Sequence, residues 1–143
     1  MKALNPERTG DQAFEDGMAV RRRILGEDYV AKSSARVAPH NQDFIDMIVR
    51  VGWGEVWTRP GFDYRTRRIL VMGTMVAIGA YEEFVMHLRA ALEDGFSLDD
   101  VKETLMQQAV YVGAPRVNHA FHLVDKTIEE LLAKGVTING YTK

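Results

Sequence analysis

Apolar side chains recur roughly three or four residues apart along most of the chain, and this spacing predicts an all-α protein. No segment alternates between apolar and polar residues convincingly enough to predict a strand. Glycine and proline divide the pattern into six expected helices, at residues 11–25, 39–58, 64–78, 81–94, 97–113 and 115–135. Residues 29–36 are too short and mixed to assign, and the tail from Val136 is expected to be extended and loosely held.

The apolar positions also predict which side chains turn toward the core. The expected inward residues are Phe14, Met18, Ile24 and Leu25 in the first helix and Phe44, Ile48, and Val51 or Trp53 in the second. Beyond Arg68 the helix at 64–78 is nearly all apolar, which is typical of a helix buried in a large core or in a subunit interface. The sequence Ser97-Leu-Asp-Asp forms a capping-box pattern with Asp in place of Glu.

Composition limits the classes of function that the chain can perform. Its 143 residues suffice for one domain with its own core, so we expect residues 1–143 to be a single domain. The net charge of −2 gives no reason to expect a nucleic-acid partner. No apolar run reaches the roughly 18 to 20 residues that span a bilayer. The N-terminal residues lack the apolar region of a secretion signal, so the expected compartment is the cytoplasm.

The chemistry available to the chain is narrowed further by the absence of cysteine, which excludes disulfides, thiolate nucleophiles and cysteine metal clusters. Glu83 and His87 stand four residues apart and therefore share one helix face. A carboxylate beside an imidazole is suited to proton transfer. The alternative is a surface ion pair, which we weigh about equally from the spacing alone.

Two further histidines, His119 and His122, lie three residues apart on the last expected helix. With Glu83 and His87 they could complete a metal site. This pattern is common by chance, and we expect no metal.

Several cationic and aromatic residues are candidates for binding an acidic substrate. Guanidinium groups bind carboxylates through two parallel hydrogen bonds. We expect Arg59 or Arg22 to anchor the substrate, with Arg116 as a further candidate, and Trp57 and Tyr111 to line the pocket. The cluster Arg65, Arg67 and Arg68 is expected to meet solvent or a neighbouring subunit.

A series of short motifs resembles the carboxymuconolactone decarboxylase family over most of the chain. The matching segments are Arg22-Arg-Ile-Leu-Gly26, Gly54-Glu-Val-Trp-Thr-Arg-Pro-Gly61, Arg65-Thr-Arg67, Glu82-Glu83, His87-Leu-Arg-Ala-Ala-Leu92, Gly95 and Ala109-Val-Tyr-Val-Gly-Ala-Pro115. A related thiol-dependent branch, similar to alkylhydroperoxidase, carries Cys-x-x-Cys-x-x-x-His on this helix. Here His87 matches the histidine, whereas Ala80 and Glu83 stand at the cysteine positions. Dithiol peroxide chemistry is therefore excluded.

The resemblance implies an all-helical, alkylhydroperoxidase-like subunit that assembles into a trimer or hexamer. It implies that 4-carboxymuconolactone is converted to 3-oxoadipate enol-lactone and carbon dioxide in protocatechuate catabolism, without a cofactor. His87 would then donate the proton or stabilise the dienolate, with Glu83 orienting it.

Tyr29, Asn118-His119 and His122 depart from the family pattern and leave the exact lactone open. The alternatives are an enzyme of the same fold acting on another lactone or β-keto acid, a metal-dependent enzyme, and a non-catalytic oligomer that binds an aromatic catabolite.

Overall fold

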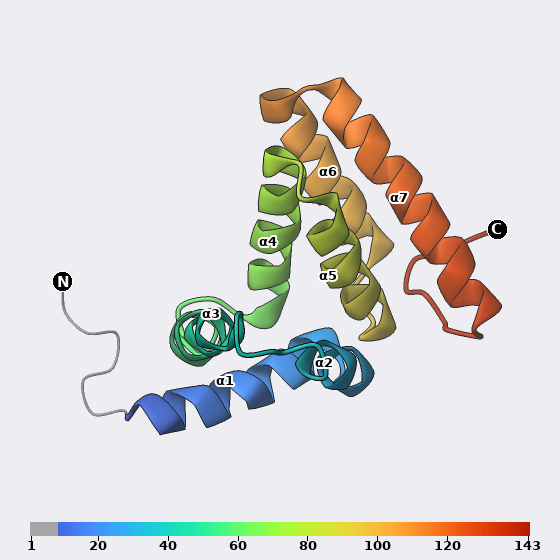
Figure 1. Cartoon of the computed structure of the whole chain (residues 1–143). Coiled ribbons are helices and arrows are strands. Elements are labelled where there is room, and N and C mark those ends of the chain that lie inside the picture. The colour runs from blue at the N-terminus through green and yellow to red at the C-terminus, as the bar shows by residue number, and fades with distance from the viewer. Residues whose placement is uncertain (1–8) are drawn as a thin grey trace. The chain divides into compact units, whose positions relative to one another are not determined.

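A computed structural model describes residues 9–143, and these residues form helices and no strand (Figure 1). The elements are α1 (Gly10–Leu25), α2 (Glu27–Ser34), α3 (Gln42–Met47), the π-helix η1 (Ile48–Val56), α4 (Tyr64–Ile78), α5 (Tyr81–Glu93), α6 (Leu98–Val112) and α7 (Ala114–Ala133). The all-α prediction is therefore confirmed for the described residues. The count of six is not, because the unassigned segment forms α2 and the second expected helix is divided into α3 and η1.

The chain divides into two compact units, one ending at Tyr64 and the other running from Arg65 to Lys143. The first unit contains α1, α2, α3 and η1, and the second contains α4 to α7. Within residues 9–143, no helix is both long and apolar enough to cross a bilayer.

In the first unit, α1 and η1 meet at backbone distance. A Cβ added to Gly54 would lie 2.0 Å from the carbonyl oxygen of Ala13, and one added to Gly17 would lie 2.2 Å from the carbonyl oxygen of Val49. The expectation that Phe14 and Met18 form the inner face of α1 is therefore wrong in detail. Both are half-buried, because the face that approaches η1 consists of the small residues Ala13 and Gly17.

The π-helix changes which side chains of the second expected helix are buried. The backbone N–H of Trp57 donates to the carbonyl of Gly52, five residues earlier, at 3.0 Å. This wider turn shifts the faces relative to an α-helix, so Val49 and Trp53 are buried. Of the alternatives Val51 and Trp53, the prediction is therefore confirmed for Trp53. It is wrong for Phe44 and Ile48, which are 58% and 40% exposed, and Val51 is 50% exposed.

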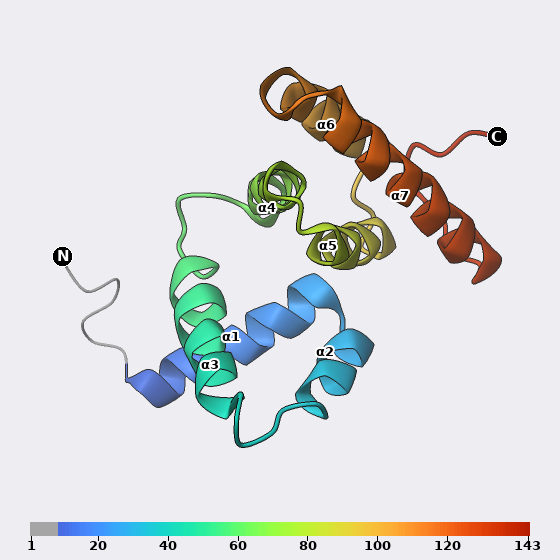
Figure 2. The same ribbon diagram turned by 45° about the horizontal axis from the view of Figure 1, so that its top comes forward.

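In the second unit, four helices pack through their side chains, and α6 and α7 run antiparallel beside each other (Figures 1 and 2). The core is centred on α5, whose Phe84, Leu88 and Leu92 are fully buried. Within the chain, Leu70 and Ile78 of α4 remain 52% and 65% exposed, so burial in a core is wrong for them, while burial in a subunit interface stays a prediction. These two residues lie two turns apart and so share one face of α4.

The ends of the second unit are tied by specific hydrogen bonds. The Ser97 hydroxyl accepts from the Asp99 backbone N–H at 3.0 Å, as a cap should, but Asp100 binds Arg65 instead of completing a capping box. The C-terminal tail is not loosely held throughout. Ile138 is buried, and Asn139 accepts a hydrogen bond from the Leu98 N–H and donates one to the Gly95 carbonyl.

Candidate active site

His87 lies in the middle of α5 and is buried, with 6% of its surface exposed. Burial and, to a smaller extent, the positive charge of Arg68 together lower the pKa of its imidazole from 6.5 to about 4. Removing an imidazole from water disfavours its charged form. His87 is therefore a neutral imidazole at neutral pH, able to donate one hydrogen bond and accept another.

The arginines at the start of α4 are a second part of this site. Arg67 and Arg68 are 8% and 4% exposed, so the expectation that they meet solvent is wrong. The Arg68 Nη1 donates to Oδ2 of Asp94 at 2.7 Å. A buried cation is costly unless it is paired, and this ion pair supplies one partner. The expectation of solvent exposure holds for Arg65, whose side chain is 58% exposed although it binds Asp100.

Glu83 and His87 differ in their surroundings although they share a helix face. Glu83 is exposed, whereas His87 is buried. The charge that perturbs the His87 pKa most is the cation of Arg68. The role of Glu83 in orienting His87 stays a prediction.

The candidates for substrate binding are distributed over both units. Arg22 is exposed on α1, with its Nε 3.6 Å from Oε2 of Glu27. Arg59 is exposed in the turn after η1. Close to it in sequence, Trp57 stacks on Trp53 with ring centroids 4.9 Å apart. Each unit therefore holds part of the expected set, with Arg22, Arg59 and Trp57 in the first.

The second unit carries the remaining candidates. Arg116 is exposed at the start of α7, and its guanidinium lies over the turn between α4 and α5, because a Cβ on Gly79 would meet its Nη1 at 2.8 Å. Tyr111, at the end of α6, is 75% exposed. An exposed tyrosine can line a pocket only where another surface approaches it.

The histidines of α7 do not join His87. His119 and His122 are both exposed, and the His119 ring stands edge-on to Tyr81 with centroids 4.5 Å apart. Among residues 9–143, no three His, Asp or Glu side chains gather where they could hold a metal ion.

Comparison of the sequence with known proteins assigns the chain to a family. Residues 42–126 match the sequence profile of the carboxymuconolactone decarboxylase family. The chain belongs to the carboxymuconolactone decarboxylase family. The matched region contains His87 and the buried arginines of α4, and it also contains Arg59 and Arg116. Arg22 lies outside it.

Curated relatives of this decarboxylase-family chain include two with named activities. A 4-carboxymuconolactone decarboxylase of Acinetobacter baylyi is 36% identical over 85% of this chain and 90% of that protein. A nitrosuccinic acid decarboxylase of Metarhizium robertsii is 32% identical over 85% of each chain. An uncharacterized 15.0 kDa protein of Paracoccus denitrificans is 27% identical over 58% of this chain and 63% of its own. Both named activities are decarboxylations.

Sequence reasoning identified His87 but missed Arg67 and Arg68 as buried groups. A usable signal existed for Arg68, because it precedes Met72 and Val76 by four and eight residues and so shares their helix face. Because both side chains are charged, they were instead expected to meet solvent or a neighbouring subunit.

Proposed function

We propose that this chain is a carboxy-lyase that releases carbon dioxide from 4-carboxymuconolactone to give 3-oxoadipate enol-lactone, without a cofactor. The observation that carries the proposal is the buried neutral His87 beside the cation of Arg68, in a chain 36% identical to a named 4-carboxymuconolactone decarboxylase. A hydrogen-bond donor and a fixed positive charge, both shielded from water, stabilise developing negative charge.

The substrate supplies its own electron sink. The bond between the ring carbon and the departing carboxylate breaks, and its electron pair moves through the ring double bond into the lactone carbonyl. Carbon dioxide leaves and a delocalised dienolate remains. One proton, taken up at the ring carbon next to the carbonyl, then gives the enol-lactone.

In this mechanism the chain must stabilise an oxyanion and hold a second carboxylate. Because the His87 imidazole is neutral, we assign its N–H to the dienolate oxygen as a hydrogen-bond donor, and the proton on the product carbon derives from solvent. One such preorganised donor contributes about 3 to 4 kcal/mol to transition-state stabilisation. The positive charge of Arg68 also stabilises this oxyanion.

The second carboxylate of the substrate requires a cation. Arg59 and Arg22 remain the first candidates, with Arg116 behind them, while Trp57 and Tyr111 are proposed to contact the ring. Loss of a charge-assisted carboxylate contact costs about 1.5 to 3 kcal/mol, which corresponds to roughly a 10- to 150-fold rise in KM. Single alanine variants that all leave KM unchanged would exclude this set.

A second substrate follows from the relative that is 32% identical and named for nitrosuccinic acid. Loss of a carboxylate from the carbon that bears a nitro group leaves a nitronate, another delocalised oxyanion. The same donor and cation would stabilise either anion. The two substrates differ in shape, so the lining of the pocket decides between them.

The deciding experiment is an assay of chelator-treated protein with each substrate, following release of carbon dioxide. We expect turnover without added metal, and His87→Ala should reduce kcat by at least about 100-fold while the circular dichroism stays unchanged. His122→Ala, which alters an exposed histidine of α7, is the matched control and should retain activity.

The other results of this assay separate the alternatives. Turnover that needs a divalent metal would favour a metal-dependent enzyme, and binding without turnover would favour a catabolite-binding protein. Activity on a different lactone or β-keto acid alone would keep the fold and chemistry but change the substrate.

Assembly into a homo-oligomer, a trimer or hexamer, belongs to the same proposal. Exposed apolar side chains occur on α4 and α6, where Ile78, Met106 and Val110 are 65%, 55% and 78% exposed. Apolar surface of this kind marks contacts between subunits. Light scattering that finds a stable monomer at micromolar concentration would overturn it.

A further inference from the structure

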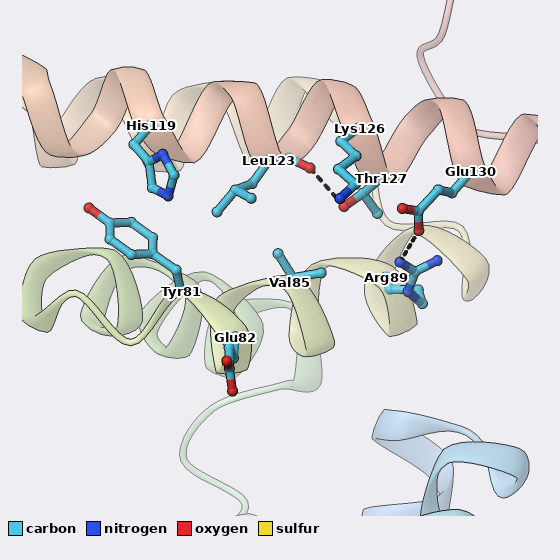
Figure 3. A pocket seen from close by; sticks show the side chains of 9 residues that line it. All are labelled: Tyr81, Glu82, Val85, Arg89, His119, Leu123, Lys126, Thr127 and Glu130. Carbon is cyan, nitrogen blue, oxygen red and sulfur yellow. Dashed lines mark hydrogen bonds and ion pairs between the residues drawn. The ribbon is translucent and has the colours of Figure 1, made fainter.

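A pocket of about 420 Å³ lies between α5 and α7 in the second unit (Figure 3). Its walls include Val85 from α5 and Leu123 from α7, whose side chains project into the space between the helices. A volume of this size is within the range of pockets that hold small molecules, about 300 to 1,000 Å³.

The pocket is separate from the His87 site. Its α5 residues Tyr81, Val85 and Arg89 are spaced four apart and line one helix face. His87 follows Val85 by two residues, which places it about 200° further around the helix axis. A ligand in this pocket would therefore occupy the side of α5 away from His87.

The charged residues give the pocket one positive end. Arg89 forms an ion pair with Glu130, so these two charges offset each other. Lys126 lines the same end, and its positive charge also acts on the Glu130 carboxylate. The two cations and one carboxylate at this end therefore leave a net positive charge. The remaining acid of the lining, Glu82, points away from the space between the helices (Figure 3).

The opposite end is aromatic. Tyr81 and His119 meet edge-to-face with ring centroids 4.5 Å apart, one from α5 and one from α7. Such a pair presents ring edges and faces to a neighbouring ring. Between the two ends, Val85 and Leu123 offer apolar contact.

We propose that this pocket binds a small cyclic or aromatic monocarboxylate, with its ring between Val85 and Leu123 and its carboxylate at Lys126. The apolar walls set the ring position, and the ammonium group selects an anion over a neutral analogue. This site is independent of the proposed catalytic activity.

The test is a titration of the full chain with benzoate as the probe and benzamide as its uncharged match, followed by calorimetry and by the ring-proton NMR signals of His119. We expect saturable benzoate binding with a dissociation constant in the millimolar range or lower, and chemical-shift changes at the His119 ring protons. Benzamide should bind about tenfold more weakly, because a charge-assisted contact is lost.

Two variants locate the site. Lys126→Gln alters an exposed residue and should weaken benzoate binding about tenfold, whereas Lys102→Gln, on exposed α6 surface outside the pocket, should leave it unchanged. Leu123→Trp should fill the space and abolish binding.

Three outcomes would overturn the proposal. They are the absence of saturable binding, equal binding in Lys126→Gln and Lys102→Gln, and light scattering that shows Leu123→Trp dissociating an oligomer, which would make the pocket a contact between copies.

Discussion

The two units of this chain reach close packing by opposite means. In the first, α1 and η1 approach until backbone atoms touch, and Gly17 and Gly54 stand where any side chain would collide. In the second, the space between helices is filled by large side chains such as Phe84 and Leu88. Backbone contact tolerates no added atom, whereas a side-chain core can rearrange in part. The first unit should therefore not tolerate side chains that add volume at these glycines. The second unit buries Arg68 and His87, and so it should be sensitive to changes of charge.

The largest expected effect is that of Gly54→Ala. Its new methyl would lie 2.0 Å from the Ala13 carbonyl oxygen, so α1 must move away from η1. We expect a loss of about 3 kcal/mol or more in the free energy of unfolding. Both tryptophans of the chain, Trp53 and Trp57, belong to this unit, so their fluorescence during urea unfolding measures the change.

Gly52→Ala is the control for this variant, because its methyl would meet only the Ile48 Cγ2 at 3.9 Å. Removing a helical glycine without a clash stabilises by about 0.4 to 1 kcal/mol. If the two variants unfold at the same urea concentration, the contact between α1 and η1 is not as close as described.

The second prediction concerns pH and His87. Its pKa is about 4 in the folded chain against 6.5 for an ordinary imidazole. Between these values the unfolded chain binds a proton that the folded chain does not. The free energy of unfolding should therefore fall as pH drops from about 6.5 to about 4, by up to about 3 kcal/mol. Above about pH 6.5, titration of His87 should not change the free energy of unfolding with pH.

Urea unfolding at a series of pH values, followed by circular dichroism, measures this slope. His87→Leu should flatten it, while the exposed His122→Gln should keep it. Equal slopes in both variants would mean that burial of His87 does not control the acid response.

A smaller effect is expected from the ion pairs of α4. Asp94→Asn removes the carboxylate that binds the buried Arg68, and we expect a cost of about 2 kcal/mol, less than for a fully buried pair because Asp94 is 33% exposed. Asp100→Asn weakens the more exposed pair with Arg65 and should cost about 1 kcal/mol or less. Thermal unfolding of the two variants side by side gives the difference, and a reversed order would contradict the contrast between buried and exposed charge.

The smallest effects belong to the helix caps. Thr9 and Gln12 form a reciprocal capping box at the start of α1, with hydrogen bonds of 3.2 and 3.1 Å. Ser97 caps α6 through one bond to the Asp99 N–H. Thr9→Ala and Ser97→Ala should each cost about 1 kcal/mol. The fluorescence midpoint should respond to Thr9→Ala, and its failure to move would show that the cap does not support the α1 contact with η1.

The sequence predicted the second unit better than the first for a physical reason. Its helices follow the ordinary helical period, so glycines such as Gly79 and Gly113, both with positive φ, ended them where expected. In the first unit, the π-turns changed the period inside a single segment. The α-helical spacing therefore predicted Phe44 and Ile48 to point inward although they are exposed, and it was correct only for Trp53.

The candidate site was predictable in part. His87 was singled out by its spacing from Glu83 and by its position in the family pattern, and the structure buries it. The burial of Arg68 was missed, because long charged side chains are usually exposed. Its partner Asp94 is 26 residues away in sequence, and only the folded structure brings the two side chains together. Whether Arg59 or Arg116 contacts substrate could not follow from spacing, because spacing does not give the shape of a pocket.

The π-helix also has a consequence for how this family can vary in length. Each wide turn of η1 accommodates a residue that an α-helix of the same rise would exclude. Deleting one residue there could restore a regular α-helix without opening a gap, because the wide turn takes up the removed residue. The residues after the deletion, including Trp57 and Arg59, would then keep their direction. Homologues that lack a single residue in this stretch should therefore still present the same side chains at the Arg59 turn.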